Sequence, residues 1–409
     1  MAGVAGMGLA ASGSVSAHGT TDTGGTSGFS GFDTVHIVGD GDGMYTTIQG
    51  AHDDLPGDGA GANGAVVIAD SYDSSDEQFP VVVDGYADIR GMSNTGTVIY
   101  NGDSTKNTFV FTATEQHNTE SPMLSNVRLA GGDNAVVVEG HVGATVQDVT
   151  IWGSNTGIKV TDNSYSQTCY DNYFRNICIS GVEGDGVYVA NNTAPHSLTF
   201  DNVNVYRAGQ HGYNLRQAGA DTVVQNSTIQ HADDWGMLIE RSISLTLRDL
   251  YFERNAEKYA SGSGNKIDIC FHSNGPNHDF LVQGCYFNGM NETVCAIHLN
   301  SGEAGEIRNC RFNRYDDGYL IQDEEHTDLN VARSTITTDG REAHFYNDGD
   351  TWGKRTRQDG IIMSTDLSTT DGKFEADKGI HDGSGSAPQG MAFWLDGQWV
   401  SQVDGSIIG

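Results

Sequence analysis

The chain has 409 residues, and its 54 acidic and 22 basic side chains give a formal net charge of −32 at pH 7. A field this negative repels phosphate backbones, which argues against a general nucleic-acid binder. Hydrophobic residues make up 37% of the chain, enough for a folded core, but no stretch reaches the roughly 18 apolar residues of a membrane span. The glycines follow no three-residue period, so the chain is not collagen-like.

The acidic excess comes with few lysines. At molar salt, charge repulsion is screened within about 3 Å, and surface carboxylates that hold water and cations keep a protein soluble. Short acidic side chains also expose less apolar surface than lysine stems do. The composition is therefore typical of a protein from a salt-saturated environment, and an ordinary acidic extracellular protein is the alternative. The seven lysines are Lys106, Lys159, Lys258, Lys266, Lys354, Lys373 and Lys378.

Residues 1–34 form an N-terminal arm or the remnant of a signal. Residues 2–17 read AGVAGMGLAASGSVSA, which resembles the hydrophobic half of a secretory signal with small residues near a cleavage point. No Lys or Arg precedes this stretch, so a charged first segment is missing. Two interpretations stay open. Either the true start lies upstream and the protein is exported, or the stretch is a flexible arm that docks into an assembly.

A repeat runs through residues 35–346 with a spacing of 22 to 35 residues. Each copy reads apolar-x-[N/D]-apolar-x-apolar, and seven of the nine third positions are Asn or Asp. Because these residues tolerate left-handed backbone angles, the column predicts a one-residue turn between two short strands. The third positions are Asn126, Asp148, Asn176, Asn202, Asn226, Asp249, Gly284, Asn309 and Arg333.

A second apolar column follows six to seven residues after most copies and often begins with glycine. Each copy thus supplies three short strands separated by turns. A unit this small cannot bury its apolar face alone, so stacking of the units into a solenoid is expected. The second column comprises residues 135–138, 157–160, 186–189, 212–215, 236–239, 296–299 and 318–321.

The period, the Asn column and the three strands per copy resemble the right-handed parallel β-helix of the pectate-lyase type. The start of the repeat region is also similar to the opening of secreted polysaccharide enzymes and tailed-virus tailspikes. The resemblance, over about residues 35–346, implies an all-β fold of about ten coils. The matching opening segments are YTTIQGA (45–51), LPG (55–57), GAVVI (64–68), FPVVV (79–83), DIRG (88–91) and GTVI (96–99).

Alternation along each strand predicts which side chains point into the solenoid. Cys285 and Cys310 are expected to stack in neighbouring coils as buried thiols, whereas Cys178 is expected to point outward. No two cysteines form a CxxC pair, so neither a zinc cluster nor a disulfide scaffold is predicted. The other residues expected to point inward are Val127, Val149, Ile177, Val203 and Leu250.

Polysaccharide enzymes of this fold work on the outer face of the sheet after the second column, and the resemblance implies a catalytic group of Asp185, His211, Asp233 and Asp234. These residues fall in three consecutive coils. Coils stack about 4.8 Å apart, so carboxylates two coils apart lie roughly 9–10 Å apart, near the upper limit for an inverting glycosidase. One carboxyl would protonate the leaving oxygen and another would activate water, while His211 tunes the charge.

The same residues have a competing explanation. Asp233-Asp234 and His211-Gly212 resemble motifs of polygalacturonases, but the histidine comes first and no Arg-x-Lys follows. Asp, Asn and Gly also fill this turn in other coils, where turn preference alone explains them. Catalysis and turn formation therefore both remain open.

Two further kinds of site are possible. A polysaccharide lyase would need acidic Ca²⁺ ligands and an Arg or Lys base, so calcium or magnesium ions are the cofactors to consider, although no metal ligand can be named. Outward aromatic side chains that could stack on sugar rings predict a carbohydrate-binding face instead. These are Tyr188, Trp235, Tyr251 and Tyr286.

Three segments depart from the repeat, and the first is an insertion at residues 161–173. Residues 253–266 form an insertion, which predicts a loop beside the outer groove. Residues 347–409 form a C-terminal tail in which two aromatic strands flank Asp396-Gly397 and predict a hairpin. The ending loosely resembles small terminal modules of tailed-virus structural proteins.

Three functions are consistent with this pattern. The first is a virion surface spike of a tailed virus that infects halophilic archaea; it would bind host-surface glycan as a homotrimer and contact other virion proteins. The second is an exported polysaccharide-degrading enzyme, either an inverting glycoside hydrolase or a polysaccharide lyase. The third is a noncatalytic cell-surface β-helix. None of them involves nucleic acid or a membrane span.

Overall fold

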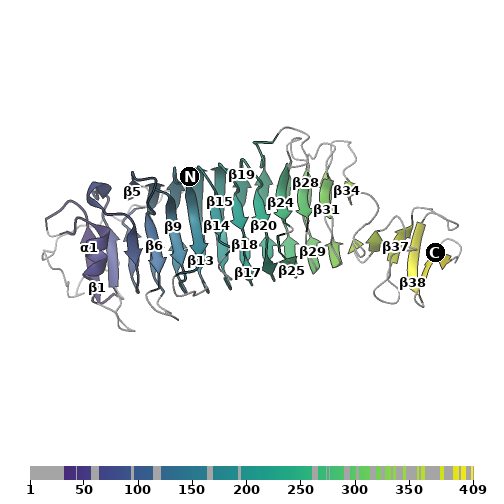
Figure 1. Ribbon diagram of the computed structural model, residues 1–409, viewed down its shortest axis with the longest axis horizontal. Coiled ribbons are helices and arrows are strands. Elements are labelled where there is room, and N and C mark those ends of the chain that lie inside the picture. The colour runs from purple at the N-terminus through teal and green to yellow at the C-terminus, as the bar shows by residue number, and fades with distance from the viewer. Residues whose placement is uncertain are drawn as a thin grey trace, which may run out of the picture.

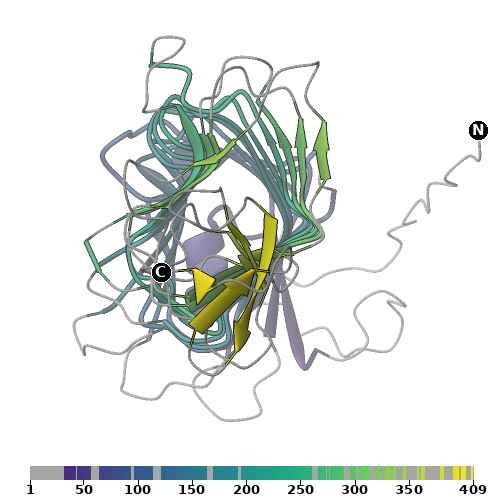
Figure 2. The same ribbon diagram turned by 90° about the vertical axis from the view of Figure 1, so that its right-hand side faces the viewer.

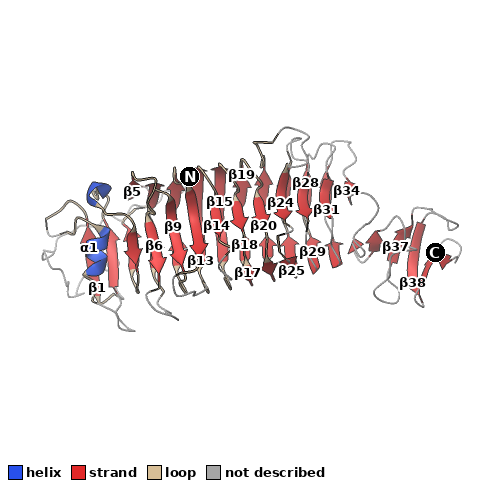
Figure 3. Cartoon of the chain, viewed as in Figure 1, coloured by secondary structure: helices blue, strands red, loops and turns tan. Residues whose placement is uncertain are grey.

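The computed structural model is an elongated stack of short strands (Figures 1 and 3). Its one α-helix among the described residues, α1 (Ile48–Asp53), lies at the N-terminal end of the stack with the 3-10 turn η1 (Ser74–Asp76). The described residues are 32–42, 44–56, 64–93, 96–113, 121–163, 169–191, 195–259, 266–272, 274–275, 277–289, 295–300, 304–313, 319–323, 328–332, 335–337, 344–346, 357–358, 361–363, 378–381, 390–395, 398–401 and 407–408. Residues 1–31 of the N-terminal arm lie outside them.

Each coil repeats the same three strands, as β10 (Thr145–Gln147), β11 (Thr150–Trp152) and β12 (Thr156–Thr161) illustrate. Every strand pairs in parallel with its counterparts in the coils before and after it, so the coils superimpose when viewed along the axis (Figure 2). This confirms the predicted all-β, right-handed parallel β-helix.

The first two strands of each coil form one long sheet, sheet A. Within the solenoid its strands are β1 (Thr34–Val38), β2 (Gly64–Ile68), β4 (Asp88–Gly91), β5 (Val98–Asn101), β7 (Met123–Ser125), β8 (Arg128–Gly131), β10, β11, β13 (Tyr173–Val182), β15 (Thr199–Ala208), β18 (Val223–Gln225), β19 (Thr228–Gln230), β22 (Thr246–Arg248), β23 (Tyr251–Glu253), β26 (Phe280–Gln283), β27 (Tyr286–Asn288), β29 (Ala304–Arg308), β30 (Arg311–Asn313), β32 (Asp328–Ala332) and β33 (Thr335–Thr337).

The third strand of each coil contributes to sheet B, and a few coils add a fourth, very short strand in sheet C. The strands of sheet B are β3 (Val81–Val83), β6 (Phe109–Thr112), β9 (Asn134–Glu139), β12, β14 (Val187–Val189), β16 (Tyr213–Leu215), β20 (Met237–Ile239), β24 (Ile267–Phe271), β28 (Cys295–Leu299), β31 (Tyr319–Asp323) and β34 (His344–Tyr346). Sheet C consists of β17 (Gly219–Ala220), β21 (Ser242–Ile243) and β25 (Asn277–His278).

The predicted turn column is confirmed wherever the structure describes it. Its residues have φ between 52° and 59°, or 67° at Gly284. Most separate the two sheet A strands of their coil, whereas Asn176 and Asn202 lie within the continuous strands β13 and β15. Arg333 lies outside the described residues. Neighbouring side chains of the column also bond along the axis: Asn176 Nδ2 donates to Asp148 Oδ1 and Asn202 Nδ2 donates to Asn176 Oδ1, both at 3.0 Å.

Two more left-handed columns, which the sequence pattern did not predict, turn the chain at the other corners. One precedes the first strand of the coil and the other follows the second strand. Because the residue types vary within each column, no single motif marks them. The first column holds Gly143, Asp171, Ser197, Asp221, Ser244 and Asp279, and the second holds Gly131, Gly153, Gly181, Arg207, His231 and Arg254.

The core is one continuous stack of apolar side chains along the axis. All seven residues predicted to point inward are at most 1% exposed, and aromatic rings such as Phe174 and Phe200 stack at 4.8 Å between centroids. Cys285 and Cys310 are buried neighbours as predicted, none of the six cysteines forms a disulfide, and Cys178 is only half-buried. Ladders of this kind need few inward residues per coil.

Glycine occupies the corner where several of the coils enter sheet B. A Cβ on Gly186 would lie 2.5 Å from Val205 Cγ1 and 2.6 Å from the carbonyl oxygen of Gly212. Gly157 and Gly236 meet similar obstacles from the core or the next coil. A side chain at these three glycines would therefore clash, whereas Ala135 and Asp268 occupy the equivalent position in the coils of β9 and β24. The residue before each of the three glycines lies on the outer face of the sheet.

The described part of the tail continues as short strands. Strands β38 and β39 pair in antiparallel fashion, with Leu395 opposite Gln398, which confirms the predicted hairpin. Asp396 and Gly397 lie outside the described residues. The strands of this module are β35 (Arg357–Gln358), β36 (Ile361–Met363), β37 (Lys378–His381), β38 (Gly390–Leu395), β39 (Gln398–Ser401) and β40 (Ile407–Ile408).

Candidate functional site

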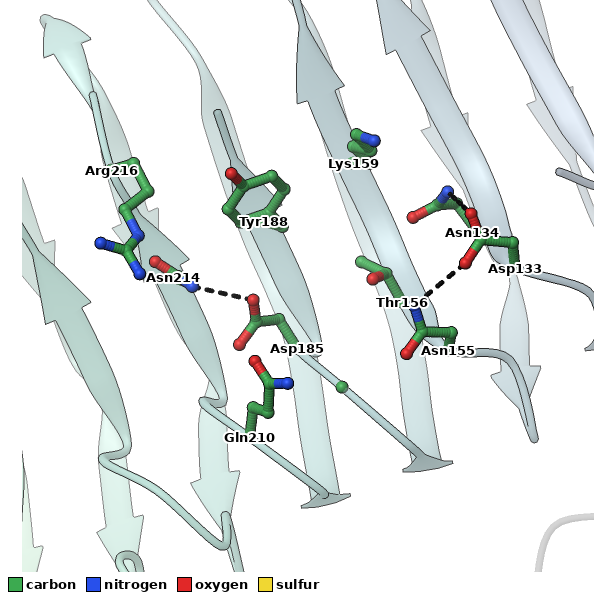
Figure 4. Close-up of a pocket in the computed structure, with 11 residues that line it drawn as sticks. Asp133, Asn134, Asn155, Thr156, Lys159, Asp185, Tyr188, Gln210, Asn214 and Arg216 are labelled. Atoms are coloured by element: carbon green, nitrogen blue, oxygen red, sulfur yellow. Dashed lines mark hydrogen bonds between the residues drawn. The ribbon is translucent and has the colours of Figure 1, made fainter. Parts of the chain in front are cut away.

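A groove of about 330 Å³ crosses the outer face of sheet B over four consecutive coils, from β9 to β16 (Figure 4). Its walls are almost entirely polar. The lining residues are Asp133, Asn134, Asn155, Thr156, Lys159, Gly184, Asp185, Tyr188, Gln210, Asn214 and Arg216. We call this feature the sheet B groove.

Asp185 lies in the floor of the groove. The Gly186 corner turns its side chain outward, yet it is only 7% exposed because neighbouring coils cover it. Its Oδ1 accepts the backbone N–H of His211 at 3.0 Å and lies 3.0 Å from His211 Nδ1, and its Oδ2 accepts Asn214 Nδ2 at 2.8 Å. Asp185 thus holds two side chains of the following coil in place.

The Asp185 contact decides which ring nitrogen of His211 can do chemistry. An ionised carboxylate only accepts hydrogen bonds, so Nδ1 of His211 donates, and in the neutral ring Nε2 keeps its lone pair. Among the described residues, none bonds to Nε2. The pair can therefore act as an oriented base, a role that differs from the charge tuning expected of His211 and the acid or base work expected of Asp185.

Asn214 leaves one polar atom unused in the same floor. Its side chain is 3% exposed; Nδ2 is bonded to Asp185, but Oδ1 is buried without a hydrogen-bond partner. A buried acceptor without a partner is costly in a folded protein. A ligand hydroxyl in the groove would supply the missing donor.

Three longer side chains stand on neighbouring strands of the groove: Lys159 on β12, Tyr188 on β14 and Arg216 just after β16 (Figure 4). Arg216 Nη1 is paired with the buried carboxylate of Glu240, which also accepts Asn274 Nδ2 at 2.9 Å. Lys159 forms no ion pair within the described part of the chain. The groove thus combines a half-buried aromatic ring with two cations.

The structure gives Asp234 partners that lie away from Asp185. Asp234 is 9% exposed, is ion-paired with Lys258, and accepts Tyr259 Oη at 2.8 Å. Burial and this carboxylate raise the pKa of Tyr259. Asp233 is exposed, and no contact between described residues joins it to His211. Of the four predicted catalytic residues, the structure brings only Asp185 and His211 together.

The four predicted carbohydrate-binding aromatics divide between two faces. Tyr188 lines the sheet B groove, and Trp235 lies beside it, with its ring centroid 5.8 Å from that of His211. Tyr251 and Tyr286 face outward from sheet A and contact each other at 5.3 Å. Because they lie on two different faces of the solenoid, the four aromatic side chains cannot form one continuous sugar-binding surface.

Sequence reasoning missed Lys159, Asn214 and Arg216. All three follow a glycine corner by two to four residues, Lys159 and Asn214 on a sheet B strand and Arg216 just after one. The signal was present, since the second column marks these strands, but their side chains differ from coil to coil and form no motif. Only the register between coils shows that they share one groove.

The described residues contain neither a cluster of metal ligands nor a membrane-spanning helix. No group of three or more His, Cys, Asp or Glu side chains there is placed to hold a metal ion, so the calcium or magnesium expectation stays a prediction. Within the same residues, no helix has the length and apolar character needed to cross a membrane.

Comparison with known proteins identifies the repeat region. The family model described as "Right handed beta helix region" matches residues 134–278 and 185–357, which together span more than half of the chain. No curated protein matches the chain in sequence.

Several solved structures share the coiled architecture at low identity. An alginate lyase from Paenibacillus sp. str. FPU-7 is 12% identical, with a TM-score of 0.49 over 77% of this chain and 98% of that chain. Tailspike protein 3 of bacteriophage CBA120 is 11% identical, with a TM-score of 0.48 over 84% of this chain and 64% of that chain. A mannuronan C-5 epimerase A-module from Azotobacter vinelandii is 12% identical, with a TM-score of 0.44 over 70% of this chain and 90% of that chain. These values support no transfer of activity.

Proposed function

This chain belongs to the family of right-handed β-helix proteins, and from that premise we propose that it is an extracellular or surface-exposed glycan-binding protein. The observation that carries the proposal is the sheet B groove, which combines a half-buried ring at Tyr188 with polar side chains and the unpaired acceptor Asn214 Oδ1. Sugars offer both an apolar ring face and many hydroxyls, so they suit a concave site with an aromatic surface and convergent polar groups.

Replacing Tyr188 tests the groove as the glycan site. The full chain, in molar KCl, would be applied to an array of immobilised neutral and acidic oligosaccharides, and the strongest hit would be titrated by calorimetry. Tyr188→Ala should weaken binding by about tenfold or more, as truncation of a central aromatic contact does. Tyr100→Ala removes a tyrosine that is 60% exposed outside the groove and should change nothing. Equal losses in both variants, or no binding at all, would overturn the proposal.

The finer form of the proposal is a virion surface spike of a tailed virus of halophilic archaea, which binds host-surface glycan as a homotrimer. The acidic composition, the Gly/Ala-rich N-terminal arm and the C-terminal hairpin support it. Light scattering in molar KCl should then give the mass of a trimer. A monomer at all concentrations would contradict the spike.

A polysaccharide-degrading enzyme is the second candidate, because Asp185 orients His211 as a base at the edge of the groove. Oligosaccharides that bind would be incubated with the chain, and both new reducing ends and the ultraviolet absorbance of unsaturated products would be followed. His211→Gln should lower the rate at least about 100-fold, the usual contribution of a positioned base. Asp233→Asn is the matched control and should keep full activity, since Asp233 is exposed. Absence of both products rules out a hydrolase and a lyase.

A further inference from the structure

The charges in the sheet B groove follow a fixed order along the solenoid axis. Lys159 belongs to the coil of β12, Asp185 and Tyr188 to the coil of β14, and Arg216 to the coil of β16. The two cations are thus two coils apart, about 10 Å along the axis by the spacing of paired strands, with a carboxylate in the coil between them. Arg216 also lies two residues beyond Asn214, the residue in register with Lys159. Figure 4 shows Lys159 and Arg216 on opposite sides of Tyr188.

Both cations remain available to a ligand. Lys159 pairs with no carboxylate in the described part of the chain, although the protein carries 54 acidic residues. Arg216 is 36% exposed and uses Nη1 for Glu240, and a guanidinium has five N–H donors in total. Glu240 therefore orients Arg216 and leaves donors that face the groove.

The coil between them repels an anion. The Asp185 carboxylate is held in the groove floor by hydrogen bonds with His211 and Asn214. Beside it, Asn214 Oδ1 needs a donor, which a neutral hydroxyl or amide supplies and a carboxylate does not. At the far end, in the coil before that of Lys159, Asp133 accepts hydrogen bonds from the side-chain amides of Asn134 and Asn155, so a second carboxylate lies beyond Lys159.

We propose that the groove selects a glycan with an anionic group on every second sugar and a neutral sugar between. Lys159 and Arg216 take the two anionic groups, and the neutral sugar packs on Tyr188 with a hydroxyl or amide donating to Asn214 Oδ1. A glycan with a charge on every sugar would place one against Asp185. The inference rests on the proposed glycan-binding function and names the class of glycan.

Three oligosaccharides of equal length test this selectivity by calorimetry with the full chain. The probes are a hyaluronan hexasaccharide, with a carboxylate on every second sugar, the same hexasaccharide after carboxyl reduction, and a hexagalacturonate, with a carboxylate on every sugar. The first should bind at least about tenfold more tightly than either of the others, because carboxyl reduction removes the charge-assisted hydrogen bonds to both Lys159 and Arg216, and hexagalacturonate adds a like-charge repulsion at Asp185. Lys159→Gln should reduce that advantage over the reduced probe, since only Arg216 then pairs with an anionic group.

Two further variants make the outcomes distinct. Arg248→Gln removes one positive charge at a half-exposed position on β22 of sheet A, outside the sheet B groove, so it should leave the preference intact. Asp185→Asn should improve binding of the hexagalacturonate relative to hyaluronan. If the reduced probe binds as well as hyaluronan and Lys159→Gln has no effect, the selectivity is wrong while glycan binding stands. If no saccharide of the wider array binds, the proposed function itself fails.

Discussion

Two imidazoles show how burial decides the chemistry of a single residue type. His211 is oriented by Asp185 at the edge of an open groove. His141 is fully buried; its Nδ1 lies 2.9 Å from the Val142 carbonyl oxygen, and its Nε2 has no hydrogen-bond partner. Burial lowers the pKa of His141, and the Val142 contact only partly opposes this effect. The His141 ring is therefore neutral in the folded protein at pH 7.

Acid should destabilise the fold through His141. Below the ordinary pKa of 6.5, the unfolded chain binds a proton that the folded protein excludes, so the free energy of unfolding falls as pH drops from about 6.5 toward the lowered value. Above 6.5 the contribution is complete. Urea unfolding between pH 4.5 and 7.5 would measure the slope, and His141→Gln should reduce it. His196→Gln removes an exposed imidazole and should leave the slope unchanged; equal slopes in all three proteins would contradict the prediction.

At the scale of the strand and turn, each coil is bent by local backbone preference and closed by steric fit. Asn and Asp supply left-handed angles at the corner within sheet A, as at Asn176 with φ of 52°. At the entrance to sheet B, Gly186 is needed for a different reason, because core and backbone atoms fill the space of a Cβ. The second corner also aims Asp185 outward, so the same glycine shapes the groove.

Two glycine substitutions separate these causes. Gly186→Ala forces a methyl group against Val205 and the Gly212 carbonyl, and it should cost about 3 kcal/mol of unfolding free energy, as overpacking does. Gly181→Ala meets no atom within 4 Å but keeps a φ of +62°, so it should cost only about 1 kcal/mol from backbone strain. Chemical denaturation measures both, and a larger cost at Gly181 would show that backbone angle dominates at these corners.

For the whole molecule, the governing quantity is the net charge of −32 spread over a long cylinder. The hydrophobic ladders that hold the coils together are continuous, but the carboxylates on the outer faces repel one another. Screening acts within about 3 Å at 1 M salt and about 10 Å at 0.1 M salt, so the repulsion grows as salt is removed. The fold therefore depends on its solvent as well as on its core.

Salt should stabilise this protein strongly. Scanning calorimetry in 2 M and 0.1 M KCl should show Tm falling by at least about 5 °C at the lower concentration, because self-repulsion is then unscreened. Sucrose at matched osmolality is the control, since it favours compact states without screening charge. Equal recovery by sucrose and by KCl would contradict an electrostatic origin.

Local patterns in the sequence determined most of the fold. Alternating apolar residues and the Asn or Asp at the turn act over only a few residues, and they predicted the parallel coils, the inward side chains and the paired thiols of Cys285 and Cys310. The hairpin of the tail was also predicted from a local pattern, the two aromatic strands that flank Asp396-Gly397. The two other left-handed columns were missed because residues as different as Ser197 and Arg207 occupy them.

The tertiary structure alone decided the site. Asp185 and His211 were foreseen as neighbours because they occupy equivalent corners, but Asp234 is held by Lys258 from an insertion whose path no repeat predicts. The groove likewise depends on which side chains of different coils meet, and that follows from the stacking register. Turns and strands are determined by residues close in sequence, whereas a groove that crosses coils is determined by residues some 25 positions apart that only stacking brings together.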